Sequence, residues 1–506
     1  MDYKFENLIS EAQVEDEVAL IELEEVFPRF LERAKNGVAE DQFKIAYIFF
    51  NLEAFLYKWK KKGDPSYHIG DFQINETIAA ELYLLAAKQG HVKAQFELSE
   101  CFANGTGVPE DDDVCIHWCK KAAEGGHRLA QEFLGMAYSL GYFGVDLDLN
   151  KSAKWYKKAA KQGLPQAQIQ IGRYYEGGVG VDRDLKEAAK WYKKAAEQKN
   201  DYIVMGGNRG DAQFILGRYY YWGHGLKENK KEALKWFKKA ICTKENGYGL
   251  QQSGMPELYI AQCYQWGEGI KKCNNEALKW YQIAAEKGQP DAQYHLGRFY
   301  HKGDLVTKNL KEAVKWLKKS ADQDTAGAQW FLGTCYESGD GVTKNLKKAF
   351  NLYKMAAEQN HPRGQCFLAK CYEIGQGVQK NLNEAIKWYK KAAEQGHALS
   401  QWSLALCYED RDGVTKNLKE AFKWYKMAAE QDHEQAQVMV GRCYENGNGV
   451  TKHLVNAYAW YNVACANGND NACEYRDSLE STLTKTQLHK AQNLSQDFYE
   501  IIQRRS

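Results

Sequence analysis

Apolar residues recur along most of this chain at the spacing of amphipathic helices, and the pattern itself repeats. In one copy, Ala292, Leu296 and Tyr300 come at every fourth position, which places them on one face of a helix. A second run follows, in which Ala313 and Leu317 share a face and lysines occupy the opposite one. The pattern therefore predicts pairs of helices, each with one buried face.

The residues between the two runs indicate where each helix ends and begins. Gly303 is placed to end the first helix, as glycine does at a C-terminal cap. Asn309, followed three residues later by Glu312, reads as a capping box that starts the second helix. Gly297 lies beside the apolar face, where the missing side chain lets another helix cross closely. The same cap recurs as Asp184/Glu187, Asn229/Glu232, Asn381/Glu384 and Asn417/Glu420.

Self-comparison shows about ten tandem copies of a 36-residue unit. The aligned positions are Ala94, Ala130, Ala167, Ala212, Pro256, Ala292, Ala328, Gly364, Ser400 and Ala436. Two steps are longer than the rest, and they locate insertions at roughly 199–210 and 245–255. Both insertions follow a second helix and precede the next first helix.

A tryptophan recurs in the second helix of nearly every copy, with Leu352 as the exception. The recurring residues are Trp118, Trp155, Trp191, Trp236, Trp280, Trp316, Trp388, Trp424 and Trp460. Because they hold one register on the apolar face, we expect them to be core wedges between adjacent helices rather than ligand-binding residues.

The repeated motif, best preserved from Ala436 to Gly468 and from Ala167 to Ala196, resembles the Sel-one-like repeat, a relative of the tetratricopeptide repeat. This resemblance implies an all-α, right-handed superhelical solenoid of antiparallel helix pairs that scaffolds protein complexes. The family acts in signalling, protein quality control and bacterial–host interaction.

We expect three parts in the chain. Residues 1–90 form an N-terminal helical cap with a divergent first repeat and a long loop, residues 91–468 hold ten repeats, and residues 469–506 form a C-terminal helical cap. In the first part, residues 11–25 carry seven acidic and no basic side chains on an amphipathic pattern. The divergent repeat would combine a helix near Asp41–Phe50 with one at Glu76–Gly90.

Composition excludes several classes of function. The formal net charge is +2, and the many Lys-Lys pairs fall on exposed helix faces with glutamates nearby, so nucleic-acid binding is not expected. No apolar run approaches the roughly 18 residues of a membrane span, and the N-terminus shows no Sec-type signal peptide. We therefore expect a cytoplasmic protein, with export by a specialised secretion system left open.

Few groups of residues in the sequence resemble a catalytic or metal-binding site. No nucleotide-binding, hydrolase or metalloprotease motif occurs, and no cofactor or small-molecule substrate is evident. Cys115, His117 and Cys119 look like metal ligands, but the repeat register puts the cysteines in the core and the histidine on the opposite face. Six cysteines share one repeat position (Cys101, Cys263, Cys335, Cys371, Cys407 and Cys443), where a small buried thiol suffices.

The pair Cys465 and Cys473 has the spacing found in disulfide-rich relatives of the family, some reported to bind penicillins. Those relatives repeat the pair in nearly every unit, whereas here it occurs once and without an export signal. We therefore expect free thiols at this pair.

Residues that vary between copies are candidates for partner binding. On the first helix, three positions form one stripe, and in helix-pair solenoids the first helices line the concave side. The stripe holds Phe96, Ile169, Phe214, Tyr294, Trp330 and Trp402; then Arg173, Arg218, Arg298, Thr334, Lys370 and Arg442; then Glu176, Tyr221, His301, Glu337, Glu373, Glu409 and Glu445. The alternative is that the aromatic residues pack against the next repeat.

The two insertions flank one repeat, which carries Tyr221 and Trp222, and the next repeat carries Trp266. Loops added to one edge of a rigid array often carry function, so we expect residues 199–255 to contribute to the partner site, unless the loops are neutral decorations. We thus expect a non-catalytic scaffold that binds proteins or peptides. The alternative is an enzyme or cell-wall-binding protein of the disulfide-rich, penicillin-binding subtype.

Overall fold

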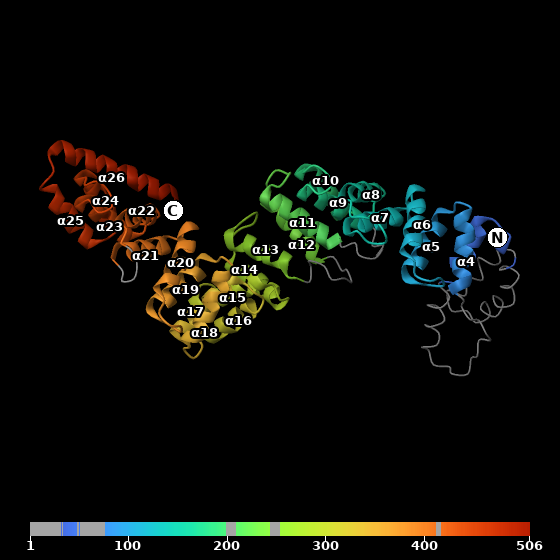
Figure 1. Ribbon diagram of the computed structural model, residues 1–506, viewed down its shortest axis with the longest axis horizontal. Coiled ribbons are helices and arrows are strands. Elements are labelled where there is room, and N and C mark those ends of the chain that lie inside the picture. Colours follow the sequence, from blue (N-terminus) through green and yellow to red (C-terminus); the bar gives the residue numbers. More distant parts are fainter. Residues whose placement is uncertain are drawn as a thin grey trace. The chain divides into compact units, whose positions relative to one another are not determined.

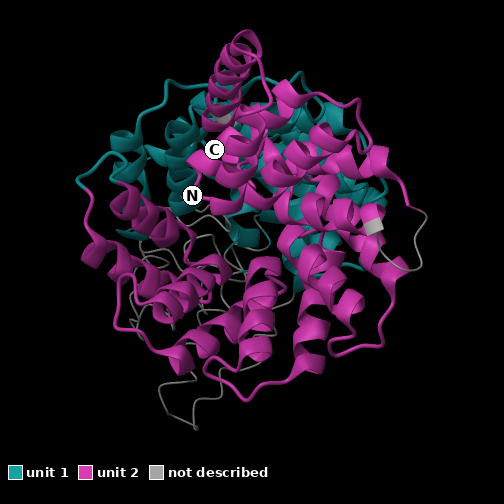
Figure 2. Cartoon of the chain, turned by 90° about the vertical axis from the view of Figure 1, so that its left-hand side faces the viewer, with its two compact units in different colours: residues 1–252, 267–271 teal, residues 253–266, 272–506 magenta. Residues whose placement is uncertain are grey.

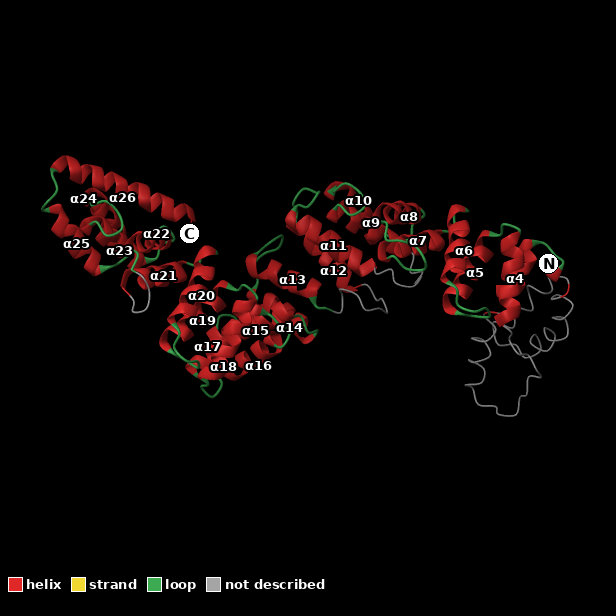
Figure 3. Cartoon of the chain, viewed as in Figure 1, coloured by secondary structure: helices red, strands yellow, loops and turns green. Residues whose placement is uncertain are grey.

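The computed structural model describes residues 32, 34–47, 50, 76–198, 209–242, 253–410 and 416–505. Every regular element in these ranges is a helix (Figure 3). The helices follow one another in pairs, so the predicted all-α class and paired-helix solenoid are confirmed. Residues 11–25 and most of both insertions lie outside the described ranges.

The chain divides into two compact units (Figure 2). The first unit comprises Met1–Gln252 and Gly267–Lys271. Beyond a short helical stretch at residues 39–47, its helices are α4 (Glu76–Lys88), α5 (Val92–Asn104), α6 (Asp112–Glu124), α7 (Arg128–Leu140), α8 (Leu149–Lys161), α9 (Pro165–Gly177), α10 (Leu185–Ala196), α11 (Arg209–Trp222) and α12 (Lys230–Cys242) (Figure 1).

The second unit comprises Ser253–Trp266 and Lys272–Ser506. Its helices are α13 (Met255–Trp266), α14 (Asn274–Glu286), α15 (Pro290–Lys302), α16 (Leu310–Ala321), α17 (Ala326–Ser338), α18 (Leu346–Glu358), α19 (Pro362–Ile374), α20 (Leu382–Glu394), α21 (Ala398–Asp410), α22 (Leu418–Ala429), α23 (Glu434–Asn446), α24 (Leu454–Ala466), α25 (Asp470–Glu480) and α26 (Lys485–Arg505). The first helices of the repeats are the odd-numbered ones from α5 to α23, and the second helices are the even-numbered ones from α6 to α24.

The predicted helix ends are confirmed. Asn309 accepts a hydrogen bond from the backbone N–H of Glu312 at 3.1 Å, and the other four predicted caps make the same bond. Gly303 ends α15 in the left-handed conformation, with φ +80°. A Cβ on Gly297 would come within 2.6 Å of Leu317 on α16, so this glycine allows the close helix crossing that the sequence predicts.

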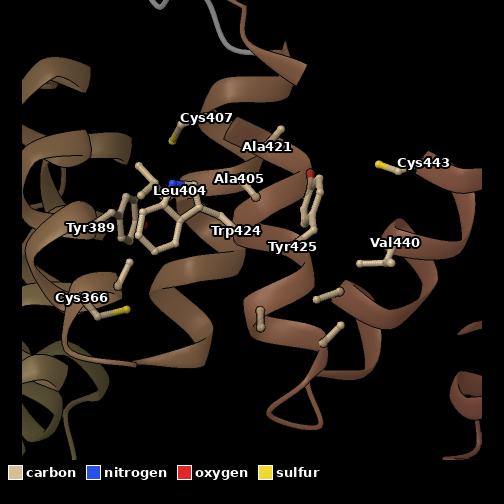
Figure 4. Close-up of a cluster of buried hydrophobic side chains, with 14 of the residues drawn as sticks. Cys366, Tyr389, Leu404, Ala405, Cys407, Ala421, Trp424, Tyr425, Val440 and Cys443 are labelled. Atoms are coloured by element: carbon tan, nitrogen blue, oxygen red, sulfur yellow. The ribbon is translucent and has the colours of Figure 1, made fainter. Parts of the chain in front are cut away.

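The repeated tryptophans are core wedges, as predicted. Trp424 is 6% exposed, and its indole points from α22 towards Tyr389 of the preceding repeat, while Tyr425 lies on the opposite side, facing α23 (Figure 4). Trp118, Trp191, Trp236 and Trp460 are also buried, and Trp155, Trp280, Trp316 and Trp388 are half-buried. In six copies a lysine three residues later covers the outer face of the indole, as Lys194 covers Trp191 at 4.2 Å. Each tryptophan therefore joins two repeats.

A buried glutamine after the aligned alanine forms a second link between repeats. Gln365 is fully buried, and its Nε2 donates to the carbonyl of Ala357, near the end of the preceding second helix. Its Oε1 accepts from Gln395, near the end of the second helix of its own repeat, at 2.7 Å. Equivalent pairs of bonds occur at Gln131, Gln168, Gln293, Gln329, Gln401 and Gln437. The amide thus satisfies a carbonyl that the helix end leaves without a helical partner.

A close backbone contact forms a third link. Gly377, in the turn after α19, has φ +74° and lies against the first carbonyl of α18 in the preceding repeat, where a Cβ would overlap the Leu346 oxygen. The same contact occurs at Gly107, Gly180, Gly225, Gly269, Gly341 and Gly449. Leu305 stands at this position in the repeat that contains α15 and α16. The turn glycine therefore fixes how closely one repeat approaches the one before it.

At the C-terminal end, helices α25 and α26 pack against α24. Cys465 and Cys473 are joined by a disulfide, with their Cα atoms 4.8 Å apart. The expectation of free thiols here is wrong, because the short turn between α24 and α25 sets the first turn of α25 beside the last turn of α24, within bridging distance. The predicted division into a cap, ten repeats and a second cap stays a prediction.

A pair of alanine variants tests the close contact at the turn glycine. Gly377→Ala and Gly396→Ala both place a Cβ at positive φ, which costs about 1–2 kcal/mol, but only the first also meets backbone atoms, since nothing lies within 4 Å of a Cβ at position 396. We expect Gly377→Ala to lower the free energy of unfolding by about 1–3 kcal/mol more than Gly396→Ala. Denaturant unfolding followed by circular dichroism measures this difference, and equal losses would contradict the contact.

Thiol titration tests the disulfide. Eleven cysteines are free, and nine of these are buried. For the oxidised protein we expect eleven reactive thiols after unfolding without reductant, and thirteen after reduction. In the native protein, Cys242 and Cys273 should react first because they are the exposed and the half-buried thiol. Thirteen thiols without reductant would contradict the bridge.

Candidate functional site

The variable stripe of the first helices is the strongest candidate site, and the structure shows which of its side chains are accessible. Arg173 and Arg442 are exposed, whereas Phe96, Ile169 and Phe214 are buried. These three residues therefore belong to the core, as expected if the aromatic residues of the stripe pack against the next repeat. Tyr294, Trp330 and Trp402 are half-buried.

The glutamates of the stripe are held by tyrosines of their own repeats. The hydroxyl of Tyr389, one of the buried core tyrosines, donates to Glu373 at 2.6 Å. The same bond joins Tyr192 to Glu176, Tyr353 to Glu337, Tyr425 to Glu409 and Tyr461 to Glu445. These carboxylates therefore satisfy buried hydroxyls, a role that sequence reasoning missed although the sixteen-residue spacing recurs in the sequence.

Three predicted site residues lie on α11 in the first unit. Arg218 is half-buried, and its Nε is enclosed without a hydrogen-bond partner in the described part of the chain. Tyr221 is buried and its hydroxyl donates to Glu268, while Lys230 lies 3.6 Å from its ring centroid. Trp222 packs edge-on against Tyr221 and remains 53% exposed. The structure thus brings Tyr221 and Trp222 together at the end of α11.

The other predicted residues lie in the second unit. Trp266, at the end of α13, is 65% exposed. Arg298 is half-buried against Tyr294, with its guanidinium carbon 5.6 Å from the ring centroid. His301 bonds Asp340 at 3.2 Å.

The two tryptophans of the stripe stack between repeats. Trp330 and His301 both contact the ring of Phe331, and Trp330 also lies 5.9 Å from His361 of the next repeat. Trp402 stacks on His433 of the next repeat at 5.3 Å. The indole N–H groups of Trp330 and Trp402 are enclosed and lack a hydrogen-bond partner among the described residues.

Histidines at the starts of first helices are a feature that sequence reasoning missed. The Nδ1 of His127 accepts from the backbone N–H of Ala130, and its ring lies 4.5 Å from Phe96 of the preceding repeat. His91, His361 and His433 accept the same kind of bond at other helix starts. Burial lowers the pKa of His127 to about 4, so the ring stays neutral and keeps its acceptor.

Acidic residues occupy the first helices near the start of the array. Burial, with a smaller contribution from Glu100, raises the pKa of Glu97 to about 7, and burial alone raises the pKa of Glu132 to about 7. Glu132 occupies the stripe position where other repeats carry aromatic or aliphatic residues. In the first unit, carboxyl groups with raised pKa values therefore lie on α5 and α7, and the stripe arginines lie on α9 and α11.

The metal candidate does not assemble. Cys115 and Cys119 are buried and His117 is exposed beside Trp118, as the repeat register predicts. No group of three or more potential ligands is arranged to hold a metal ion within the described ranges. In the same ranges, no helix combines the length and apolarity needed to cross a bilayer.

Comparison with protein families gives one match that spans most of the chain. The family model for the Sel1 repeat matches eleven segments, at residues 66–91, 92–127, 128–164, 165–200, 210–242, 257–289, 290–325, 326–361, 362–397, 398–433 and 434–469. The first of these contains α4, the second helix of the divergent repeat expected from the sequence.

Solved structures resemble the chain along its length. A protective antigen of uropathogenic Escherichia coli with an SLR fold is 31% identical, covers 94% of this chain and 96% of its own, and gives a TM-score of 0.71. A Sel1 repeat protein from Oxalobacter formigenes is 29% identical over 69% of this chain and 93% of its own, with a TM-score of 0.52.

Curated relatives match over shorter segments. A chitin synthase regulator of Saccharomyces cerevisiae is 34% identical over 22% of this chain and 17% of its own length. Chitin synthase regulatory factor 3 of Schizosaccharomyces pombe is 33% identical over 19% of this chain and 11% of its own length. The chain thus matches less than a fifth of these regulators.

The neutral histidine caps predict a pH dependence of stability. Because the pKa of His127 is lower in the folded than in the unfolded chain, the unfolded state binds more protons between about pH 6.5 and 4, and the contribution of His127 to stability falls as pH falls through this window. Asparagine keeps a cap acceptor without titrating. We expect His127→Asn to be less stable than the parent at pH 7 and the difference to shrink towards pH 5.

Glu97 and Glu132 act in the opposite direction, since their raised pKa values favour the folded state on acidification. The measurement is therefore the difference in unfolding free energy between the parent and His127→Asn at a series of pH values. The contributions of Glu97 and Glu132 are the same in both proteins and cancel in this difference. A difference that does not change with pH would contradict the neutral cap.

Proposed function

The chain belongs to the Sel1 repeat family, and on that premise we propose that it is a non-catalytic scaffold that binds partner proteins or peptides. The proposed binding surface is the accessible part of its first helices and their ends. The site residues we propose are Arg218, Tyr221, Trp222, Trp266, Arg298, His301, Trp330 and Trp402.

One observation carries this proposal: the positions that form the core repeat between copies, and the accessible positions at the ends of the first helices vary. The aligned alanines, the glutamines that follow them and the second-helix tyrosines are buried in copy after copy. The last residue of the first helix, by contrast, is Leu140, Trp222, Trp266, Lys302 or Ile374 in different copies, and the apolar ones are exposed. Exposed large aromatic side chains are enriched at binding surfaces, because they bury much area on association.

The comparisons agree with a regulatory or adaptor role without naming a partner. Two of the curated relatives are named as regulators of chitin synthase, which is a function exerted on another protein. We propose that this chain likewise acts through binding, and that it does so in the cytoplasm.

A role in bacterial–host interaction is a second candidate, and one observation favours it. The Escherichia coli protein that resembles this chain along nearly its whole length is described as a protective antigen. The penicillin-binding subtype gains less support, because the chain has a single disulfide and eleven free cysteines.

Replacing the two exposed tryptophans tests the proposed surface. We expect Trp222→Ala combined with Trp266→Ala to reduce capture of the partner by roughly tenfold, because hot-spot tryptophans contribute about 2 kcal/mol or more. Both side chains are more than half exposed, so the unfolding free energy should change by no more than about 0.5 kcal/mol each. The measurement is affinity capture from the source cell with quantitative mass spectrometry, repeated on the purified partner.

Met355→Ala is the control, since Met355 is 41% exposed on α18, a second helix outside the proposed surface. It should leave capture of the partner unchanged. Full capture by a folded double variant would refute this surface.

A further inference from the structure

A cleft of about 470 Å³ lies in the first unit among α6, α7 and α8. Tyr138 and Trp155 form its apolar walls, and Glu124 is its single carboxylate. Its remaining lining is basic, consisting of Lys120, Lys151, Lys154, Lys157, Lys158 and Lys161.

The charge of the cleft arises from two departures from the repeat pattern on α8. Lys151 of α8 is equivalent to Glu187 of α10 in the next repeat. Lys161, the last residue of α8, is equivalent to Glu197, which directly follows α10. In the α10 repeat these glutamates pair with lysines, Glu187 with Lys190 at 2.8 Å and Glu197 with Lys193 at 3.9 Å. Helix α8 instead has five lysines and no carboxylate.

Half of the lysines in the cleft have partners. Lys157 donates to the hydroxyl of Tyr175 at 2.7 Å, and Lys158 lies 3.9 Å from the centroid of the Trp155 indole. Lys151 pairs with Asp148, the cap of α8, at 3.2 Å.

The other three, Lys120, Lys154 and Lys161, make no ion pair with any described residue. Lys154 is the counterpart of Lys190, whose glutamate partner is replaced here by Lys151. The replacements therefore leave uncompensated positive charge around an apolar pocket.

Exposed apolar residues lie close in sequence to the lining of the cleft. Leu140 at the end of α7 and Tyr142 and Leu147 in the following turn are 51–61% exposed. Their neighbours in sequence, Tyr138 and Lys151, line the cleft. A surface that combines unpaired ammonium groups with apolar walls is complementary to a segment that combines carboxylates with apolar side chains.

We propose that this cleft binds an acidic segment of a partner protein. Carboxylates of the segment pair with Lys120, Lys154 and Lys161, and an apolar side chain of the segment packs between Tyr138 and Trp155. This second surface goes beyond the proposed stripe, and it shares with that proposal only the premise that the chain binds proteins.

A nucleic acid or an anionic membrane fits the cleft less well. Specific protein–DNA interfaces bury about 1,000–2,500 Å² of continuous, strongly basic surface. Here the basic region is limited to α8 and Lys120 of α6, because α6 carries Asp112 and Asp113 in its first turn and the α10 repeat keeps its paired glutamates. Those carboxylates would repel phosphates beyond the cleft.

The test uses a fluorescein-labelled peptide of about a dozen residues, in which glutamates flank a central phenylalanine. A second peptide, in which every glutamate is replaced by glutamine, serves as its uncharged counterpart. Lys151→Glu with Lys161→Glu restores the charge pattern of the α10 repeat, so the variant should fold. Lys311→Glu with Lys318→Glu is the matched control, since it changes the net charge equally on the exposed face of α16. Circular dichroism verifies that both variants are folded.

Fluorescence anisotropy at low salt measures binding. We expect the parent to bind the glutamate peptide, the Lys151/Lys161 variant to bind it roughly tenfold more weakly, and the α16 control to differ by less than about twofold. The glutamine peptide should not bind. Lys154 and Lys161 should also be protected from acetylation by the bound glutamate peptide, as mass spectrometry would show.

Three results would overturn the proposal: no binding by the parent, equal weakening by both variants, or preferred binding of duplex DNA or phosphatidylserine vesicles that the Lys151/Lys161 variant loses. The Trp222/Trp266 variant separates this inference from the proposed function. This variant should bind the peptide normally. Failure of the cleft proposal would therefore not contradict the stripe proposal, and failure of the stripe proposal would not contradict the cleft proposal.

Discussion

The structure depends most on burying a glutamine between consecutive repeats. An unpaired amide in the core would cost about 1–3 kcal/mol, so the side chain is tolerated only where both its donor and its acceptor are satisfied. At Gln365 the donor reaches the carbonyl of Ala357 in the preceding repeat, and the acceptor takes a hydrogen bond from Gln395 in its own repeat. Both bonds form only when three helices are in register. The glutamine therefore specifies the pairing of repeats, whereas the alanine and tryptophan contacts supply apolar burial without that directionality.

The sequence predicts the helices and their ends because those features are local. A capping box needs residues three apart, and a core face needs residues four apart, so both patterns are visible in a single copy. The recurrence of Trp424 and its equivalents also shows that they are buried, because positions facing solvent need not keep one residue.

Contacts between distant residues are harder to predict. The Tyr389–Glu373 bond, the packing of His127 on Phe96 and the Cys465–Cys473 disulfide each depend on how one helix lies against another. The stripe shows the same limit, since Phe214 and Trp222 are both aromatic residues of α11 but are 1% and 53% exposed. Periodicity gives the face of a helix, while the neighbouring helix determines how much of that face stays accessible.

The turn glycine has a consequence for how such an array can change in length. The connection within each helix pair lies against the preceding repeat, and Gly377 leaves no space there for even one additional carbon atom. The connection between α7 and α8 is one residue longer than its counterparts, and there Gly144 lies against the Asp113 side chain instead of a helix carbonyl. Among the described junctions between pairs, Gly90, Gly126, Gly163, Gly288, Gly396 and Gly468 have nothing within 4 Å of a Cβ, whereas Gly254 lies against the Ala284 carbonyl. Both long insertions in the sequence fall at junctions of this kind. An array of this kind can therefore grow by duplicating whole units, whereas its long loops are added at the junctions between units.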